Sequence, residues 1–316
     1  MNRESGLQSD LFATYSIVAR DEKTGQMGVA VQSCAFSVGS AVSWGEAGVG
    51  VVATQSFTNI DFGPEGLALL RSGVSADGAL KQLLDGDPGR DVRQVAVLDS
   101  SGRAAAHTGA KCIAAAGHLV ADGVSVQANM MTDDSVWPAM LAAYQNASGD
   151  LASRLLAALE AAEMAGGDIR GRQSAALLIV GGDHMEKPWQ GRLVELRVED
   201  HVEPLAELAR LLRLKRAYTS YRKFIFAVRD GRTAEGAASL RETLDLAPEL
   251  DEPRLSAAVG LYFEGQTDQA LGTFRDVFAR KPRLAEWLTR MMTAGVYPSD
   301  PAIVQLIERA RGETLR

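Results

Sequence analysis

Hydrophobic and polar positions divide the chain into a first part that mixes strands with helices and a second part that is helical. Between residues 14 and 57, short apolar and β-branched runs are separated by turns, which is typical of strands. The runs Thr14–Arg20 and Met27–Val31 flank a glycine-bearing turn at residues 21–25 and predict a β-hairpin. Val49–Gln55 is small and apolar throughout, as a strand buried on both faces would be.

Helical and strand patterns follow one another up to about residue 200. The order is strands, two helices, strands, two helices, strands, which predicts an α+β fold with helix pairs on the outer faces of two stacked sheets. The expected helices are 64–70, 76–84, 134–146 and 150–165, and the expected later strands are 92–98, 103–107, 124–127, 173–180 and 192–198.

The composition changes after about residue 200. A linker helix is expected at residues 203–228, and residues 229–296 contain an internal repeat with an offset of 34 residues, because residues 230–233 recur as 264–267 and Pro248 recurs as Pro282. This offset is the tetratricopeptide period. We therefore expect a tetratricopeptide-like helical domain at residues 229–316. Residues 229–296 either bind a protein partner, or the helices pack on the first domain or mediate dimers.

Composition and charge narrow the functional classes. The chain has 316 residues, is 46% hydrophobic, and carries a net charge of -7, which argues against a nucleic-acid-binding protein. No apolar run approaches the roughly 20 residues that span a bilayer, and the first ten residues lack the apolar region of a secretory signal. A cytoplasmic location and no membrane association are therefore expected.

Cysteine and histidine usage gives no sign of a metal or a cofactor. Two cysteines, Cys34 and Cys112, cannot form a disulfide framework, and the four histidines lack metal-ligand spacing. No CxxC, HExxH, GxSxG or P-loop motif is present. A metal-dependent enzyme is the weakest of the functional hypotheses, and no cofactor is expected.

Thr14 is the most informative candidate, because it begins a strand. One class of enzymes attacks its substrate with the hydroxyl of a terminal Thr, Ser or Cys and uses the freed α-amine as the base. That amine has a pKa of about 8, so it can act near neutral pH. Thirteen residues precede Thr14, so its amine is free only if they are removed. The alternative is a β-branched residue that simply starts a strand.

A set of short motifs occurs in an order similar to that of one bacterial family. Over about residues 14–220 the chain resembles the family known as domain of unknown function 1028. The motifs that carry the resemblance are 14–19 (TYSIVA), 28–33 (GVAVQS), 48–55 (GVGVVATQ), 62–67, 87–90, 107–109, 117–118 and 166–177 (GGDIRGRQSAAL).

The resemblance implies a fold and a reaction class. The family looks like a member of the N-terminal nucleophile (Ntn) hydrolase superfamily, which implies a four-layer αββα sandwich at residues 14–202 and hydrolysis of an amide bond. The family has no settled substrate. Some relatives carry a C-terminal segment regarded as peptidoglycan-binding, whereas the 34-residue period here indicates tetratricopeptide-like helices.

The chain departs from the family in two places. Relatives often begin Met-Thr, whereas Thr14 here follows an extension at residues 1–13. Relatives also often have Lys or His after the serine that matches Ser33, and this chain has Cys34. If a basic group there tunes the nucleophile, this protein is weak or altered as an enzyme.

The candidate catalytic residues are Thr14, Ser33 and Asn59. Ser33 ends the second hairpin strand, close to the start of the first, and could orient the amine. Asn59 follows the buried strand, where an amide suits an oxyanion hole or a turn cap.

The candidate substrate-binding residues share polar chemistry at predicted strand ends and in a glycine-rich loop. Ser16 faces the same side of its strand as Thr14. An arginine in the loop could bind a substrate carboxylate through two hydrogen bonds, or an Asp–Arg pair could fasten the loop. A lone cysteine is either a thiol nucleophile or a small buried hydrophobe. The full set is Ser16, Cys34, Gln55, Asn129, Asp168, Arg170 and Arg172.

Two functional hypotheses follow. The first is an Ntn-type amidohydrolase that acts on a small amide, peptide-like or carbamoyl substrate, with Thr14 as nucleophile once the extension is removed. The second is a non-catalytic binding or scaffold protein, with an inactive Ntn-like core and a partner-binding helical repeat. A homo-oligomer is expected in either case.

Overall fold

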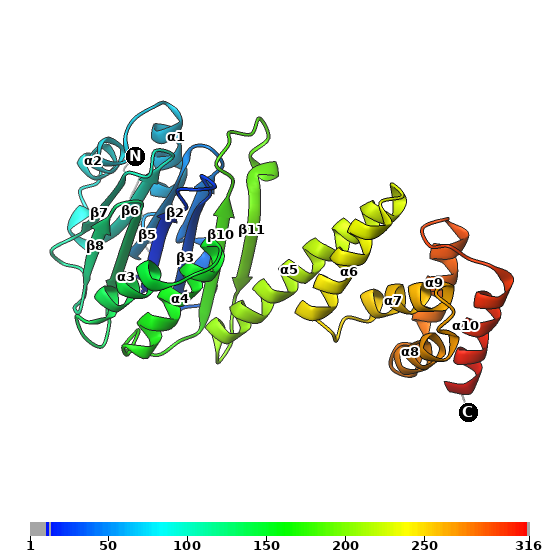
Figure 1. Cartoon of the computed structure of the whole chain (residues 1–316). Coiled ribbons are helices and arrows are strands. Elements are labelled where there is room, and N and C mark those ends of the chain that lie inside the picture. The colour runs from blue at the N-terminus through cyan, green and yellow to red at the C-terminus, as the bar shows by residue number, and fades with distance from the viewer. Residues whose placement is uncertain (1–10, 13, 315–316) are drawn as a thin grey trace, which may run out of the picture. The chain divides into compact units, whose positions relative to one another are not determined.

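The computed structural model describes residues 11–12 and 14–314 and divides the chain into two compact units, with the boundary between residues 210 and 211. The first unit contains two antiparallel sheets with helices, and the second is helical (Figure 1). The expected α+β organisation, with an all-helical C-terminal region, is confirmed. No helix in the described part of the chain is both long and apolar enough to cross a membrane.

The first sheet has the order β1-β5-β6-β7, and β4 also pairs with β5. The short strand β1 is paired through Leu11 with Phe57 and through Phe12 with Ser56. The chain therefore leaves this sheet just before Thr14, which belongs to the second sheet. The strands are β1 (Leu11–Phe12), β4 (Ser43–Glu46), β5 (Gly50–Phe57), β6 (Arg93–Asp99) and β7 (Ala104–Thr108).

The second sheet has the order β11-β10-β3-β2-β9-β8, which places β2 and β3 in its centre. The predicted hairpin is confirmed, with Thr14 opposite Ser33 and Arg20 opposite Met27. Its turn is fixed by Asp21, whose carboxylate accepts from the Thr24 amide at 2.8 Å. The strands are β2 (Thr14–Arg20), β3 (Met27–Ser33), β8 (Gly117–Ala121), β9 (Val124–Asn129), β10 (Ser174–Val180) and β11 (Arg192–Val198).

The two sheets face each other across an apolar core. Val29 and Val31 of β3 pack there with Val51 and Ala53 of β5, because alternate residues of a strand point to one face. The next residues point outward, and a Cβ at Gly28 would lie 2.6 Å from Leu155, so the glycine lets a helix approach.

Helix pairs cover the outer faces of the sheets (Figure 1). Helices α1 (Phe62–Arg71) and α2 (Ala76–Asp85) pack on β5, β6 and β7. Helices α3 (Val136–Asn146) and α4 (Leu151–Met164) pack on the second sheet, where α4 contacts β2 and β3. The strand β8 was not expected, because its exposed Leu119 and Val120 break the alternation of a half-buried strand.

The C-terminal region contains six described helices. They are α5 (Pro204–Arg229), α6 (Thr233–Leu246), α7 (Asp251–Phe263), α8 (Thr267–Arg280), α9 (Arg283–Thr293) and α10 (Pro301–Thr314). Helices α5, α7 and α9 end in the same way, at Gly231, Gly265 and Gly295, which have φ of 73°, 84° and 73°. The amide after each glycine bonds to the carbonyl five residues earlier, which is a Schellman end.

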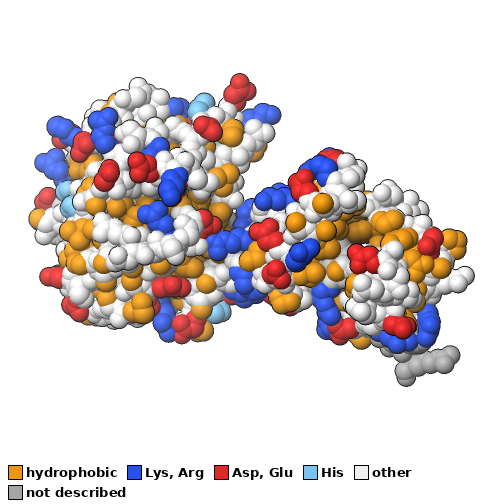
Figure 2. Space-filling model, viewed as in Figure 1, with side chains coloured by type: hydrophobic (Ala, Val, Ile, Leu, Met, Phe, Trp, Pro, Cys, Tyr) orange, Lys and Arg blue, Asp and Glu red, His pale blue; other side chains and the backbone are white. Residues whose placement is uncertain are grey.

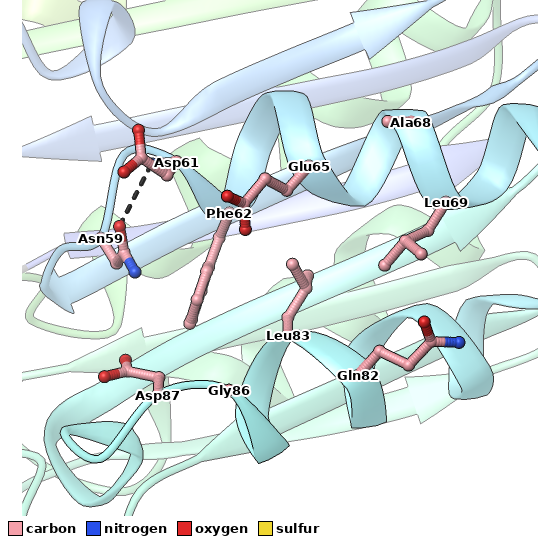
Figure 3. A pocket seen from close by; sticks show the side chains of 10 residues that line it. All are labelled: Asn59, Asp61, Phe62, Glu65, Ala68, Leu69, Gln82, Leu83, Gly86 and Asp87. Carbon is pink, nitrogen blue, oxygen red and sulfur yellow. Dashed lines mark hydrogen bonds between the residues drawn. The ribbon is translucent and has the colours of Figure 1, made fainter.

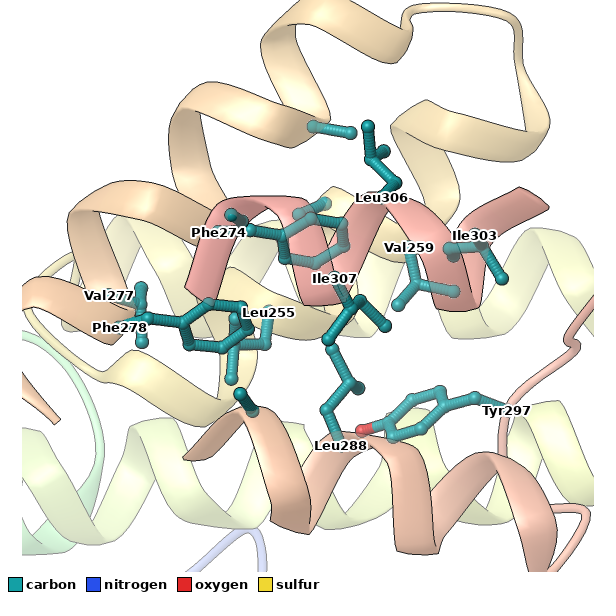
Figure 4. Packing of buried hydrophobic residues seen from close by; sticks show 14 of the residues in the cluster. Leu255, Val259, Phe274, Val277, Phe278, Leu288, Tyr297, Ile303, Leu306 and Ile307 are labelled. Carbon is teal, nitrogen blue, oxygen red and sulfur yellow. The ribbon is translucent and has the colours of Figure 1, made fainter. Parts of the chain in front are cut away.

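The core of the second unit is formed by apolar side chains from successive helices. Figure 4 shows Leu255 and Val259 of α7 turned toward Phe274 of α8 and Ile307 of α10. The rings of Phe274 and Phe278 stack with centroids 5.8 Å apart. Packing of this kind accounts for the helical spacing of apolar residues in the sequence.

Candidate functional site

Thr14 lies at the start of the central strand β2, with its side chain between the two sheets. The alternation of β2 sets this direction, since Val18 belongs to the core between the sheets and Ser16 bonds across to β5. Thr14 is paired with Ser33 on one side and with Asn129 on the other. Three of the predicted residues therefore lie next to one another at one end of the second sheet.

Two polar atoms at this end, on residues that pair with each other, are buried without a hydrogen-bond partner among the described residues. They are the hydroxyl oxygen of Thr14 and the side-chain carbonyl oxygen of Asn129, and both residues are 0% exposed. Buried polar groups almost always have a partner, so two orphans on paired residues need an explanation. A water or a ligand group between them would supply it.

The side chains of Ser16 and Gln55 connect β2 to the opposite sheet. Ser16 Oγ donates to Gln55 Oε1 at 2.6 Å, and Gln55 Nε2 donates to the Thr14 carbonyl oxygen at 3.1 Å. Asn129 Nδ2 also points toward this carbonyl, at 3.5 Å. Two amides therefore hold the backbone of Thr14 from the sheet opposite and from the neighbouring strand.

Gln94 is a member of this network that the sequence did not single out. Its Oε1 accepts from Gln55 at 2.7 Å and from Asn129 at 3.0 Å, and its Nε2 donates to the Ala128 carbonyl at 2.8 Å. The backbone acceptor fixes which end of the Gln94 amide is the donor, and Gln94 in turn fixes Asn129. The orphan oxygen of Asn129 is thus held as an acceptor. A glutamine inside the apolar run of β6 was the available signal.

Asp168, Arg170 and Cys34 form a group at the same end of the second sheet. The Cys34 amide donates to Asp168 Oδ2 at 3.1 Å, and Arg170 Nη2 lies 3.0 Å from the same oxygen. The hydrogen bond that Arg170 donates to the Asp168 carboxylate raises the pKa of Arg170 above its ordinary value. The Cys34 thiol donates to the Arg170 carbonyl at 3.5 Å. Asp168 therefore links Arg170 of the loop to the end of β3.

Arg172 lies on the other face of the second sheet. It is 3.2 Å from Glu163 of α4 and also pairs with Glu203. Glu163 accepts from the Tyr15 hydroxyl at 2.7 Å, and Tyr15 points away from the Thr14 side of β2. Burial raises the pKa of Tyr15 well above its usual range, and Glu163 adds to this. Arg172 is therefore not brought to Thr14.

Asn59 also lies away from Thr14, in a groove of about 610 Å³ between α1 and α2. Figure 3 shows Asn59 at one end of this groove, beside Asp61 and opposite Asp87. Its carbonyl accepts from Thr54 Oγ1 at 3.1 Å, and Thr54 is on the face of β5 opposite to Gln55. Its side chain accepts from the Asp61 amide at 3.2 Å, as a turn cap does.

Asp87, at the far side of this groove, forms a buried ion pair. Arg93 Nε donates to its carboxylate at 2.7 Å. Arg93 is 4% exposed and Asp87 is 8% exposed. Burial alone would raise the pKa of Asp87, but the hydrogen bonds from Arg93 and the Gly89 amide hold the pKa below its ordinary value. The ionised carboxylate is therefore the form that stabilises the fold.

We expect Asp87→Asn to lower the free energy of unfolding by about 3 kcal/mol at pH 7, because it leaves the buried Arg93 charge unpaired. A carboxylate with a depressed pKa stabilises above its unfolded value of about 3.9, and this contribution is lost as pH falls through the folded pKa. Urea unfolding at pH 7 and pH 3 measures both effects. Asp85→Asn, at an exposed i,i+4 pair, is the control and should change stability by less than about 0.5 kcal/mol. Equal effects of the two substitutions would contradict the prediction.

The described residues contain no group of three or more His, Cys, Asp or Glu side chains placed to hold a metal ion. The polar atoms around Thr14 are hydroxyls and amides, which can donate hydrogen bonds to a substrate and accept them from it. The arrangement therefore places the Thr14 hydroxyl beside the fixed acceptor oxygen of Asn129, on a strand end whose backbone is held by Gln55.

Comparison with known proteins identifies the family. The model of the family of unknown function DUF1028 matches residues 14–208. The chain belongs to the DUF1028 family. Among solved structures it is similar to the crystal structure of the DUF1028 protein SPO2555 from Silicibacter pomeroyi, at 35% identity and a TM-score of 0.57, over 63% of this chain and 84% of that one. No curated protein matches.

The range matched by the DUF1028 family begins at the candidate nucleophile. It begins at Thr14, the first residue of β2, and ends within α5. The strand β1 and the helices α6 to α10 therefore lie outside the matched range, whereas every candidate site residue lies inside it.

Proposed function

We propose that this chain is an Ntn-type amidohydrolase whose nucleophile is Thr14 after removal of residues 1–13. The observation that carries the proposal is the hydroxyl of Thr14, which is buried at the first residue of the central strand and has no hydrogen-bond partner within the described part of the chain. The acceptor of Asn129 is held beside it. A nucleophile of this class consists of a terminal hydroxyl whose base is its own α-amine, so neither a histidine nor a metal ion is needed.

The arrangement of layers supports an Ntn-like αββα sandwich for residues 14–202. Helices α1 and α2 lie outside one sheet, α3 and α4 lie outside the other, and the two sheets pack face to face. In this fold the nucleophile is expected between the sheets at the end of a central strand, which is the position of Thr14 in β2.

The proposed reaction proceeds through an ester on Thr14. Its Oγ attacks the carbonyl carbon of a small amide, peptide-like or carbamoyl substrate, and the hydroxyl proton passes to the freed α-amine. The C–N bond then breaks, the α-ammonium protonates the leaving amine, and the acyl group remains on the oxygen. Water attacks the ester with the α-amine as base, which releases the acid and restores Thr14.

The neighbouring residues have positioning and binding roles in this proposal. Gln55 and Asn129 hold the Thr14 carbonyl, so they fix the strand end that carries the nucleophile. Ser33, directly across from Thr14, would orient the freed amine. The Asn129 oxygen would accept from an N–H of the substrate. Arg170, whose side chain is 35% exposed, would meet the substrate from the rim.

The extension must leave before this chemistry can occur. Of residues 1–13, the structure describes residues 11–12, which pair with Phe57 and Ser56 of the opposite sheet. With this segment in place Thr14 is 0% exposed and its nitrogen is part of a peptide bond. Removal frees the amine of Thr14.

The burial of Thr14 and its blocked nitrogen favour a second candidate function. This candidate is a non-catalytic binding protein with a tetratricopeptide-like helical domain. Three helices of this region end at equivalent glycines, as helix-hairpin units of a repeat do. Hydrophobic side chains gather on the face of the C-terminal helices seen in Figure 2. Within residues 229–296, Phe263 at the end of α7 is 45% exposed. A protein partner would bind through residues 229–296.

The state of the N-terminus distinguishes the two candidates. We expect the protein produced without an N-terminal tag to start at Thr14, as measured by intact mass and N-terminal sequencing. Such a start supports the hydrolase. A start at Met1 or Asn2 leaves the amine blocked and supports the binding protein, whose partner would then be sought with residues 229–296.

A further inference from the structure

A second hollow lies at the end of β2 away from Thr14. It has a volume of about 310 Å³ and is enclosed by the turns after β2, β6 and β8 and by the helices α3 and α4. Arg20 is the last residue of β2, six residues along the strand from the candidate nucleophile. The hollow and the Thr14 site are therefore at opposite ends of one strand.

Two buried groups of this hollow have no partner among the described residues. The Nε of Arg20 is buried without a hydrogen-bond acceptor, and no described residue forms an ion pair with its guanidinium. Tyr144 of α3 is 3% exposed, and its hydroxyl is likewise without a hydrogen-bond partner. An Nε–H can only donate, and a buried donor without an acceptor is costly. The group missing beside Arg20 is therefore an acceptor, whereas the Tyr144 hydroxyl can donate as well as accept and has the Arg154 side chain beside it.

The turns around Arg20 leave room for such a group. The Arg20 amide donates to the Gly123 carbonyl at 2.8 Å, which holds the strand end in place. Gly102 and Gly123 have φ of 91° and 68°, so both turns need glycine. A Cβ at Gly102 would lie 3.6 Å from the Arg20 side chain. Gly102 thus borders the Arg20 side chain, and Gly123 borders the Arg20 backbone.

The charges that face the hollow favour a monoanion. Asp21 is already engaged, because its carboxylate accepts from Thr24 and lies 3.5 Å from Arg154. Arg154 also stacks over the Tyr144 ring, 4.3 Å from its centroid. The cations are thus Arg20, Lys23 and Arg154, and the carboxylates are Asp21, Glu22 and Asp122. A multiply charged anion would be repelled by three carboxylates, whereas one negative charge would complete the pairing of Arg20.

We propose that this hollow binds a small carboxylate, whose oxygens accept from the Arg20 guanidinium and the Tyr144 hydroxyl. A carboxylate matches the geometry of the guanidinium, supplies the acceptor that the Arg20 Nε–H requires, and offers a second oxygen to which the Tyr144 hydroxyl can donate. The site does not use Thr14 or any residue of the proposed hydrolase, so it stands whether or not that proposal holds.

The test is a titration of the full chain with sodium acetate, at ionic strength held constant with sodium chloride, followed in ¹H–¹⁵N spectra. The Arg20 Nε–H peak is assigned by its loss in Arg20→Gln. We expect it to shift saturably, with a Kd on the order of 1 mM. Tyr144→Phe should weaken binding about tenfold, and so should Arg20→Gln as read from the Gly102 and Gly123 amides. Arg290→Gln, an exposed arginine of α9, is the control and should leave binding unchanged.

Three results would overturn the proposal. The first is a shift that does not saturate or that chloride reproduces, which marks a nonspecific anion effect. The second is saturable binding that Tyr144→Phe and Arg20→Gln leave unchanged, which places the anion elsewhere. The third is tighter binding of inorganic phosphate than of acetate, which contradicts the carboxylate. The dispersion of the spectra shows in each variant whether the fold is retained.

Discussion

A chain that begins at Thr14 is expected to be acylated by p-nitrophenyl acetate, and Thr14→Ala is expected to lower the rate by about 10³-fold or more. The substitution removes the attacking oxygen and leaves no other hydroxyl on the terminal residue. An activated ester is used because it reports on the nucleophile without requiring the natural substrate. Release of p-nitrophenolate, followed by absorbance, measures the rate.

The same assay has a predicted pH dependence and three matched controls. The rate should rise with pH through about 8, because the free α-amine is the base and its protonated form cannot accept the hydroxyl proton. Thr14→Ser should retain most of the rate. Cys34→Ala should leave it unchanged, since the thiol is engaged with the Arg170 carbonyl. The chain with residues 1–13 should be as slow as Thr14→Ala. A rate that followed Cys34 instead would make the thiol the nucleophile.

Gln94→Ala is expected to lower the free energy of unfolding of the first unit by about 4 kcal/mol. It opens a cavity between the sheets and removes the acceptor of the Gln55 and Asn129 amides. It also leaves the Ala128 carbonyl without its donor. The network acts as a unit, so the loss should exceed that of a single neutral hydrogen bond.

Urea unfolding in a Trp287→Phe background measures this effect selectively. Removing Trp287 leaves Trp44, Trp137 and Trp189, which all belong to the first unit. Gln82→Ala on the exposed side of α2 is the control and should change stability by less than about 0.5 kcal/mol. A cost of Gln94→Ala below about 1 kcal/mol would show that the amide network does not stabilise the sheets.

Much of the fold could be predicted, because strands and helices here keep their periods. The hairpin of β2 and β3 has the expected ends, since its turn carries Asp21 and Gly25 at the positions the turn requires. The helices α3 and α4 begin within two residues of the expected positions. The strand β1 was missed, because a two-residue pairing leaves no period in the sequence.

The site was harder to predict than the fold, because a strand's sequence does not say which sheet its polar face meets. Ser16, Ser33 and Asn129 join Thr14 because alternation and register bring them to one face of the second sheet, and Gln55 reaches them from the opposite sheet. Asn59 follows the same strand as Gln55, but its loop turns to the opposite face of β5.

Gln94 could not be predicted as a site residue from the sequence. Its role depends on a backbone carbonyl of β9 and on two amides from different strands, and none of these contacts is local in the sequence. Only the pairing of the sheets brings them together.

The most direct measurement is to treat the chain that begins at Thr14 with a β-lactone, which acylates terminal threonine hydroxyls, and to locate the adduct by intact mass and peptide mapping. The account predicts one acyl group, on the peptide that starts at Thr14, and no adduct on the chain that retains residues 1–13. An adduct on Cys34 or another residue, or no adduct on a folded chain with a free Thr14, would contradict it.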